Sequence, residues 1–70
     1  MTQREPEYWC VGLLHDPQPE DKLRYYCDER EAIEAAHKRA DCDHRAVVAV
    51  WNSRDEAVWI FTDEKQWSAI

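Results

Sequence analysis

The chain has 70 residues, of which 15 are acidic and nine are basic, so its formal net charge is −6 at pH 7. A chain this short builds one hydrophobic core, so residues 1–70 are expected to form a single compact domain with residues 1–7 as a flexible N-terminus. The acidic balance argues against direct binding to nucleic acid, because such binding depends on Lys and Arg side chains that neutralise phosphates.

The N-terminal residues are polar and lack the apolar core of a signal peptide. The apolar run 46–51 is far shorter than the roughly 20 residues of a membrane-spanning helix, so no membrane partner is expected. An odd number of cysteines, three, favours reduced thiols. These features predict a cytoplasmic protein.

The first expected element is a strand over residues 8–15, which is apolar on both faces. Residues 16–21 contain two prolines and are expected to form a loop, because proline cannot donate to a strand ladder. A shorter strand over residues 23–27 is expected to pair antiparallel with the first.

A helix is expected over Glu29–Ala40. Asp28 is the predicted N-cap, and Glu31 completes the pattern of a capping box. The face expected to be buried is mostly alanine, with Ala32, Ile33, Ala36 and Ala40 within one arc. Such a face lets the helix approach a sheet closely.

The rest of the chain predicts a second hairpin, with strands over residues 45–51 and 57–62 around a turn at residues 52–56. The tail 67–70 is apolar enough to dock, with Trp67 over an edge or the rim of the core. The fold class is therefore α+β with the order ββαββ: a four-stranded, mainly antiparallel sheet with one helix packed on one face.

The runs 46–51 and 57–61 are apolar at almost every position, which is typical of strands buried on both faces. One helix covers only one of these faces. The other face is therefore expected to contact a protein partner or a second copy of the chain, with Tyr26, Val48, Val50, Trp59 and Trp67 as the apolar interface residues.

Three further side chains, His37, Cys42 and His44, lie within eight residues of one another and are candidate metal ligands, since zinc binds imidazole and thiolate. Their spacing matches no standard zinc site. No nucleophile with a neighbouring base is apparent, and the single glycine, Gly12, excludes glycine-rich phosphate loops. The sequence therefore predicts a protein that is not an enzyme and binds no cofactor.

Acidic residues recur in the expected helix and turns. They are candidates for binding a basic surface of a partner, since complementary charge directs protein association. The candidates are Glu31, Glu34, Asp55, Glu56, Asp63 and Glu64.

A very short acidic chain with one capped, alanine-rich helix (Asp28–Ala40), a C-terminal hairpin and a tail containing Trp67 resembles small stand-alone proteins of phages and mobile elements. Among these it is similar to some small anti-CRISPR proteins. The resemblance covers residues 23–70 and lies in the order of elements, so it assigns no functional residue. It implies binding to a host CRISPR effector complex in the host cytoplasm and a block of DNA recruitment without catalysis.

The leading hypothesis is thus a non-enzymatic acidic protein that binds a basic surface of a larger host assembly and inhibits or modulates it. One alternative is an obligate homodimer with a structural or accessory role. A second alternative is a small metal-binding domain that uses His37, Cys42 and His44.

Overall fold

The computed structural model describes residues 7–69. Residues 1–6 and 70 lie outside the described part, and with them most of the N-terminus predicted to be flexible. The elements are, in chain order, β1 (Trp9–Leu13), α1 (Pro19–Leu23), α2 (Glu29–Cys42), β2 (Val48–Asn52), β3 (Ala57–Phe61) and β4 (Gln66–Ser68).

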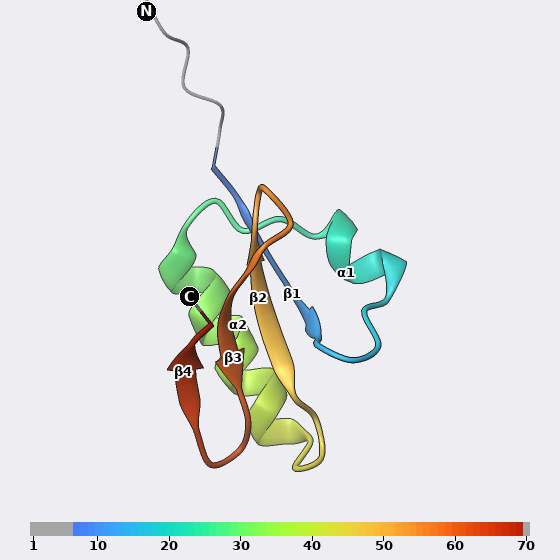
Figure 1. The fold of residues 1–70 in the computed structure, drawn as a ribbon, viewed down its shortest axis with the longest axis vertical. Coiled ribbons are helices and arrows are strands. Elements are labelled where there is room, and N and C mark those ends of the chain that lie inside the picture. The colour runs from blue at the N-terminus through green and yellow to red at the C-terminus, as the bar shows by residue number, and fades with distance from the viewer. Residues whose placement is uncertain (1–6, 70) are drawn as a thin grey trace, which may run out of the picture.

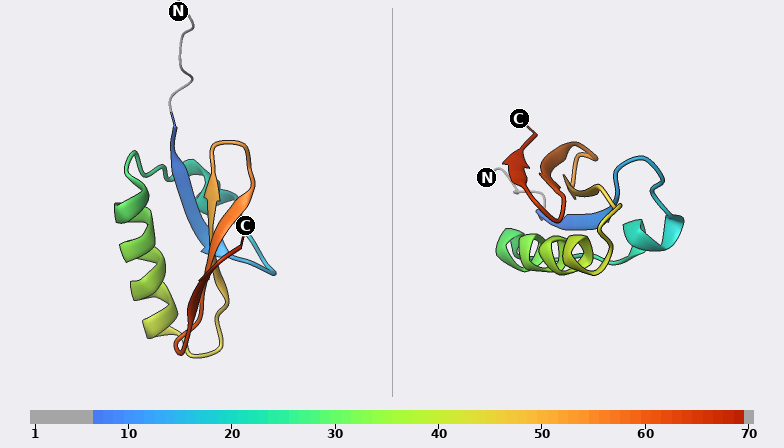
Figure 2. Two further views of the ribbon diagram at one scale, coloured as in Figure 1. Left: turned by 60° about the vertical axis from the view of Figure 1, so that its left-hand side comes forward. Right: turned by 90° about the horizontal axis from the view of Figure 1, so that it is seen from below.

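The strands form one four-stranded sheet in the order β1-β2-β3-β4, and each neighbouring pair is antiparallel. The main helix, α2, packs on one face of this sheet, and the short helix α1 lies beyond the β1 edge (Figures 1 and 2). The predicted class, α+β with a four-stranded antiparallel sheet and one main helix on one face, is confirmed.

The helix α2 begins where the sequence predicts. The backbone N–H of Arg30 donates to Asp28 Oδ1 at 3.0 Å, which satisfies one of the free donors of the first turn. The reciprocal capping contact predicted for Glu31 is absent from the described hydrogen bonds. The helix ends two residues later than predicted, at Cys42.

The core lies between α2 and the sheet. Ala32, Ala36 and Ala40 of the helix are fully buried there, because small side chains let the helix lie close to the strands. The sheet supplies the bulk. The other buried members of this core are Val11, Ala46, Val48, Val50 and Phe61.

The strand predicted over residues 23–27 is wrong. Residues 19–23 form α1 instead, with Pro19 at the first position and the Gln18 N–H donating to Asp21 Oδ2 at 3.3 Å. Only Tyr26 bridges to β1, exchanging two backbone hydrogen bonds with Trp9. The fourth strand of the sheet comes from the tail, as β4.

A bulge in β3 explains how two neighbouring apolar residues, Val58 and Trp59, both pack against the core. Trp51 pairs with Ala57, but Val50 pairs with Trp59, so β3 has one extra residue, Val58, at this step. Both Val58 and Trp59 pack against the core on the helix side. A strictly alternating strand would turn one of them to the opposite face.

The face of the sheet opposite α2 is crossed by one row of register partners, Gly12, Ala49, Ile60 and Trp67. The first three are buried, and Trp67, on the edge strand β4, is 44% exposed. The tail therefore docks as predicted in outline, as a strand beside β3. We call this face the outer face.

In the described part of the chain, neither helix has the length and apolar character needed to cross a membrane.

Candidate functional site

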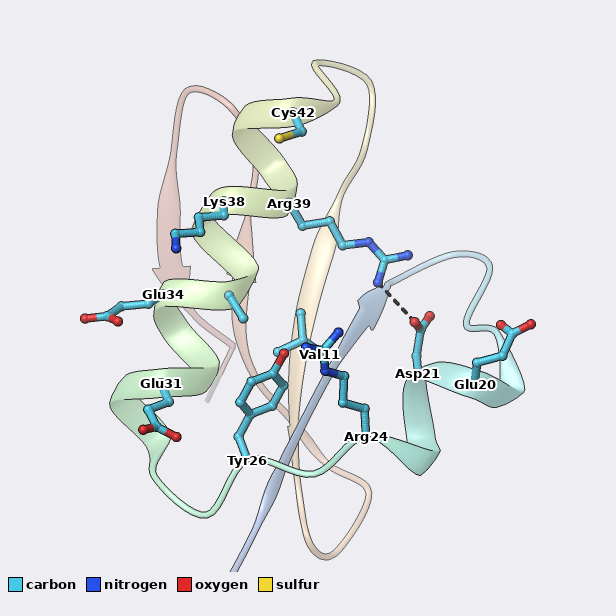
Figure 3. A pocket seen from close by; sticks show the side chains of 11 residues that line it. Val11, Glu20, Asp21, Arg24, Tyr26, Glu31, Glu34, Lys38, Arg39 and Cys42 are labelled. Atoms are coloured by element: carbon cyan, nitrogen blue, oxygen red, sulfur yellow. Dashed lines mark hydrogen bonds and ion pairs between the residues drawn. The ribbon is translucent and has the colours of Figure 1, made fainter.

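A groove of about 700 Å³ lies between α1 and α2. Its lining includes Val11 of β1, Ala35 of α2 and Tyr26 of the connection between the helices, which supply apolar surface (Figure 3). The groove exists because α1 stands beside β1 instead of continuing the sheet. We call it the α1–α2 groove.

Charged side chains of both signs surround the groove. Its acidic residues are Glu20, Asp21, Glu31 and Glu34, and its basic residues are Arg24, Lys38 and Arg39. An apolar floor inside a charged rim is typical of surfaces that bind other proteins.

One ion pair crosses the groove. Arg39 Nη1 of α2 lies 3.1 Å from Asp21 Oδ1 of α1 (Figure 3). The Arg24 guanidinium carbon lies 6.0 Å from the centre of the Tyr26 ring, the range of a cation–π contact. Two of the three basic residues of the groove, Arg39 and Arg24, therefore have partners within the fold.

By contrast, Glu31 and Glu34 make no ion pair with any residue that the structure describes, and both are exposed on one turn of α2. Among described residues, Lys38 also lacks an ion-pair partner. The α2 rim therefore carries two carboxylates and one ammonium group that have no ion-pair partner among the described residues, which leaves a net charge of −1.

The six acidic candidates do not form one surface. Glu31 and Glu34 line the α1–α2 groove, whereas residues 55–56 lie in the β2–β3 turn and residues 63–64 in the β3–β4 turn. These two turns lie at opposite ends of β3 (Figure 1). Asp63 already contacts a neighbour, His44, whose Nδ1 lies 3.0 Å from Asp63 Oδ2.

The apolar interface candidates also divide. Val48 and Val50 are fully buried under α2, so the prediction that they contact a partner is wrong: their side chains point to the helix face. Trp59 packs against the core and its indole N–H donates to Glu29 Oε1 at 3.0 Å. Tyr26 lines the groove, and Trp67 is on the exposed edge of the outer face.

The candidate metal ligands do not converge. His37 Nδ1 lies 3.1 Å from Asp41 Oδ2, His44 contacts Asp63, and the Cys42 side chain is on the rim of the α1–α2 groove. Within residues 7–69, no three side chains of the metal-binding types form a group that would hold an ion. The arrangement gives no support to a zinc site.

Sequence reasoning missed α1 and therefore the groove. The signal was present: Gln18 and Pro19 followed by Glu20 and Asp21 is an N-terminal helix pattern, with proline at the first position and acidic residues in the first turn.

Comparison of the chain with family models, curated proteins and solved structures finds no match in any of the three.

Proposed function

We propose that this protein is a non-enzymatic protein-binding module that inhibits or modulates a larger host assembly by binding a basic segment of it in the α1–α2 groove. The observation that supports the proposal is an apolar floor beside two exposed carboxylates, Glu31 and Glu34, that form no ion pair with a described residue. A basic segment would bury apolar stems on the floor and place its charge against this rim.

A CRISPR effector complex is the assembly that the resemblance suggests, and we propose it as the first partner to test. Such complexes hold nucleic acid in positively charged channels. Long-range electrostatic attraction would draw a protein with a net charge of −6 towards such a channel before any direct contact forms. The proposal places the action in the host cytoplasm.

The experiment measures binding of the purified chain to purified effector complexes by interferometry, together with inhibition of target-DNA binding. The variant Glu31→Lys/Glu34→Lys reverses charge at the groove. The matched control, Asp63→Lys/Glu64→Lys, makes the same change in charge at the β3–β4 turn. Glu31, Glu34 and Glu64 are exposed, and the Asp63 side chain, which contacts His44, is 29% exposed.

We expect the groove variant to bind at least about tenfold more weakly than the original chain, and the control to bind within about threefold of it. A reversed charge that contacts the partner weakens binding more than a reversed charge far from the interface. Equal loss in both variants would assign the effect to net charge alone and remove the groove from the proposal. Absence of binding to every effector tested would remove the CRISPR assignment.

A homodimer is the second candidate, because the main helix α2 packs on the opposite face of the sheet and the outer face ends at Trp67, which is 44% exposed. The test is the molar mass by sedimentation over a hundredfold dilution, for the original chain and for Trp67→Ala. A constant monomer mass would remove this candidate. A dimer that Trp67→Ala dissociates would support it.

A further inference from the structure

Three consecutive residues of the connection between the helices, 24–26, direct their side chains alternately. Arg24 and Tyr26 line the α1–α2 groove, whereas Tyr25 lines a separate pocket. The backbone is extended at Arg24 and forms a β-bridge at Tyr26, and an extended chain sends successive side chains to opposite sides. Tyr25 is 57% exposed, so the core does not require its ring.

This second pocket, which we call the aromatic pocket, has a volume of about 270 Å³. It gathers residues from the start of β1, the connection between the helices, the end of β2 and the β2–β3 turn. Its lining residues are Tyr8, Cys10, Tyr25, Trp51, Asn52, Ser53 and Asp55.

Three aromatic side chains supply its walls. The Tyr8 and Tyr25 rings meet edge to face, with centroids 4.7 Å apart and planes at 65°. Trp51 contributes the third ring from β2, where it pairs with Cys10 of β1. The face of an aromatic ring carries partial negative charge, and pockets built from several such rings recognise alkylammonium cations.

A carboxylate completes the pocket. Asp55 lines it from the β2–β3 turn, where its backbone has φ 64°. The turn is held by Asn52, whose Oδ1 accepts from the N–H groups of Arg54 and Glu56 at 3.0 Å each. The Asp55 N–H donates to the Asn52 carbonyl at 3.0 Å. These hydrogen bonds hold the backbone of the turn, and with it the Cα of Asp55, beside the pocket.

We infer that the aromatic pocket binds an alkylammonium group. The aromatic walls favour a cation over a neutral group of the same shape, and the Asp55 carboxylate adds charge complementarity. The identity of the natural ligand rests on the proposed function: the cation is then a lysine side chain of the basic partner. Such a partner would have to extend from the α1–α2 groove across residues 24–26, because Arg24 and Tyr26 line the groove and Tyr25 lines the pocket.

The test uses free small cations, so it does not depend on any partner. Choline is compared with 3,3-dimethyl-1-butanol, in which a carbon replaces the charged nitrogen and the shape is retained. Binding is followed by NMR through the indole N–H signal of Trp51, with the signals of the other tryptophans as internal references. A second arm uses n-butylammonium, which has the end group of a lysine side chain.

We expect choline to shift the Trp51 signal in a saturable way, with an affinity at least about tenfold above that of the neutral alcohol. Saturable binding of n-butylammonium would indicate a lysine side chain as the natural cation, whereas binding of choline alone would indicate a quaternary ammonium group. Equal affinity for choline and the alcohol, or no saturable shift with either cation, would overturn the inference.

Three variants sharpen the test. Tyr25→Ala removes an exposed wall and is expected to abolish the choline-dependent shift, while Tyr25→Phe keeps the ring and is expected to preserve it. Asp55→Asn removes the charge and retains a residue type that tolerates positive φ, so choline binding should weaken severalfold. Glu64→Gln, which removes an exposed carboxylate in the β3–β4 turn, is the control and should leave choline binding unchanged.

Each spectrum also reports whether the variant is folded, through the dispersion of its signals. Choline binding that survives Tyr25→Ala would contradict the inference even if effector binding were present. Choline binding without any effector binding would retain the aromatic pocket and remove the proposed partner. The two hypotheses therefore fail separately.

Discussion

The two helices are attached to one sheet in different ways. The helix α2 is held by burial, with three fully buried alanines against Phe61 and the β2 valines. The helix α1 is short and is held beside β1 by the ion pair between Asp21 and Arg39 and by a close approach to Gly12. One wall of the α1–α2 groove is thus part of the core, whereas the other rests on a few polar contacts.

The largest difference is expected when the α2 attachment is broken. Phe61→Ala should lower the free energy of unfolding by about 3–5 kcal/mol, because it leaves a cavity in the core beneath α2. Urea unfolding followed by circular dichroism measures the change. Trp67→Ala, an aromatic truncation at an exposed site, should cost about 1 kcal/mol or less. Similar losses in both variants would contradict the assignment of the core.

A smaller effect is expected from filling the close contact between α2 and the sheet. Ala36→Leu adds bulk at a fully buried position and should destabilise the protein by about 1–3 kcal/mol. Ala35→Leu is the matched change one residue away, where the side chain lines the groove and has room. It should alter stability little, and the thermal unfolding midpoints of the two variants give the comparison.

The attachment of α1 is tested at Gly12. A Cβ at this position would lie 2.9 Å from Asp21 Oδ2 and 3.1 Å from Asp21 Cβ, so the Asp21 side chain has to move. Gly12→Ala should cost about 1 kcal/mol and change the amide NMR signals of residues 20–23, while those of α2 outside Arg39 stay in place. Unchanged signals for residues 20–23 would show that α1 does not depend on this contact.

The smallest effect is expected at the ion pair. Asp21→Asn removes a charge whose side chain is 17% exposed and should cost up to about 1 kcal/mol, since its partner Arg39 is partly exposed. Asp63→Asn makes the same change opposite His44, whose side chain is 81% exposed, and should cost nothing measurable. Urea midpoints distinguish the two, and equal values would mean that the Asp21 contact adds no stability.

The sequence predicted the α2 layer well because its signals are local. A capping residue, Asp28, and alanines at helical spacing specify the helix and its buried face. The β2–β3 hairpin follows from two apolar runs around a polar turn. The register between β2 and β3 could not be predicted, because the extra residue in β3 shifts the pairing and no feature of the amino-acid sequence indicates where it lies.

The candidate site was predicted less well, because it depends on where α1 lies. Pro17 and Pro19 favour a loop over residues 16–21 when only the sequence is considered, although Pro19 begins the helix α1. The apolar character of residues 23–27 then favoured a strand, whereas the structure divides the side chains of residues 24–26 between the α1–α2 groove and the aromatic pocket. Which side a short connection presents is decided by tertiary contacts.

The strand order has a consequence for how the chain folds. The strands β2, β3 and β4 follow one another through short turns, whereas β1 meets β2 only after both helices have intervened. Contacts between sequence neighbours form sooner than contacts that close a long loop, so we expect β1 to pair last. Pulse-labelled hydrogen exchange during refolding would then show β1 amides protected after those of β3. Because Val11 lines the α1–α2 groove and Cys10 lines the aromatic pocket, both binding surfaces would be completed only in this final step.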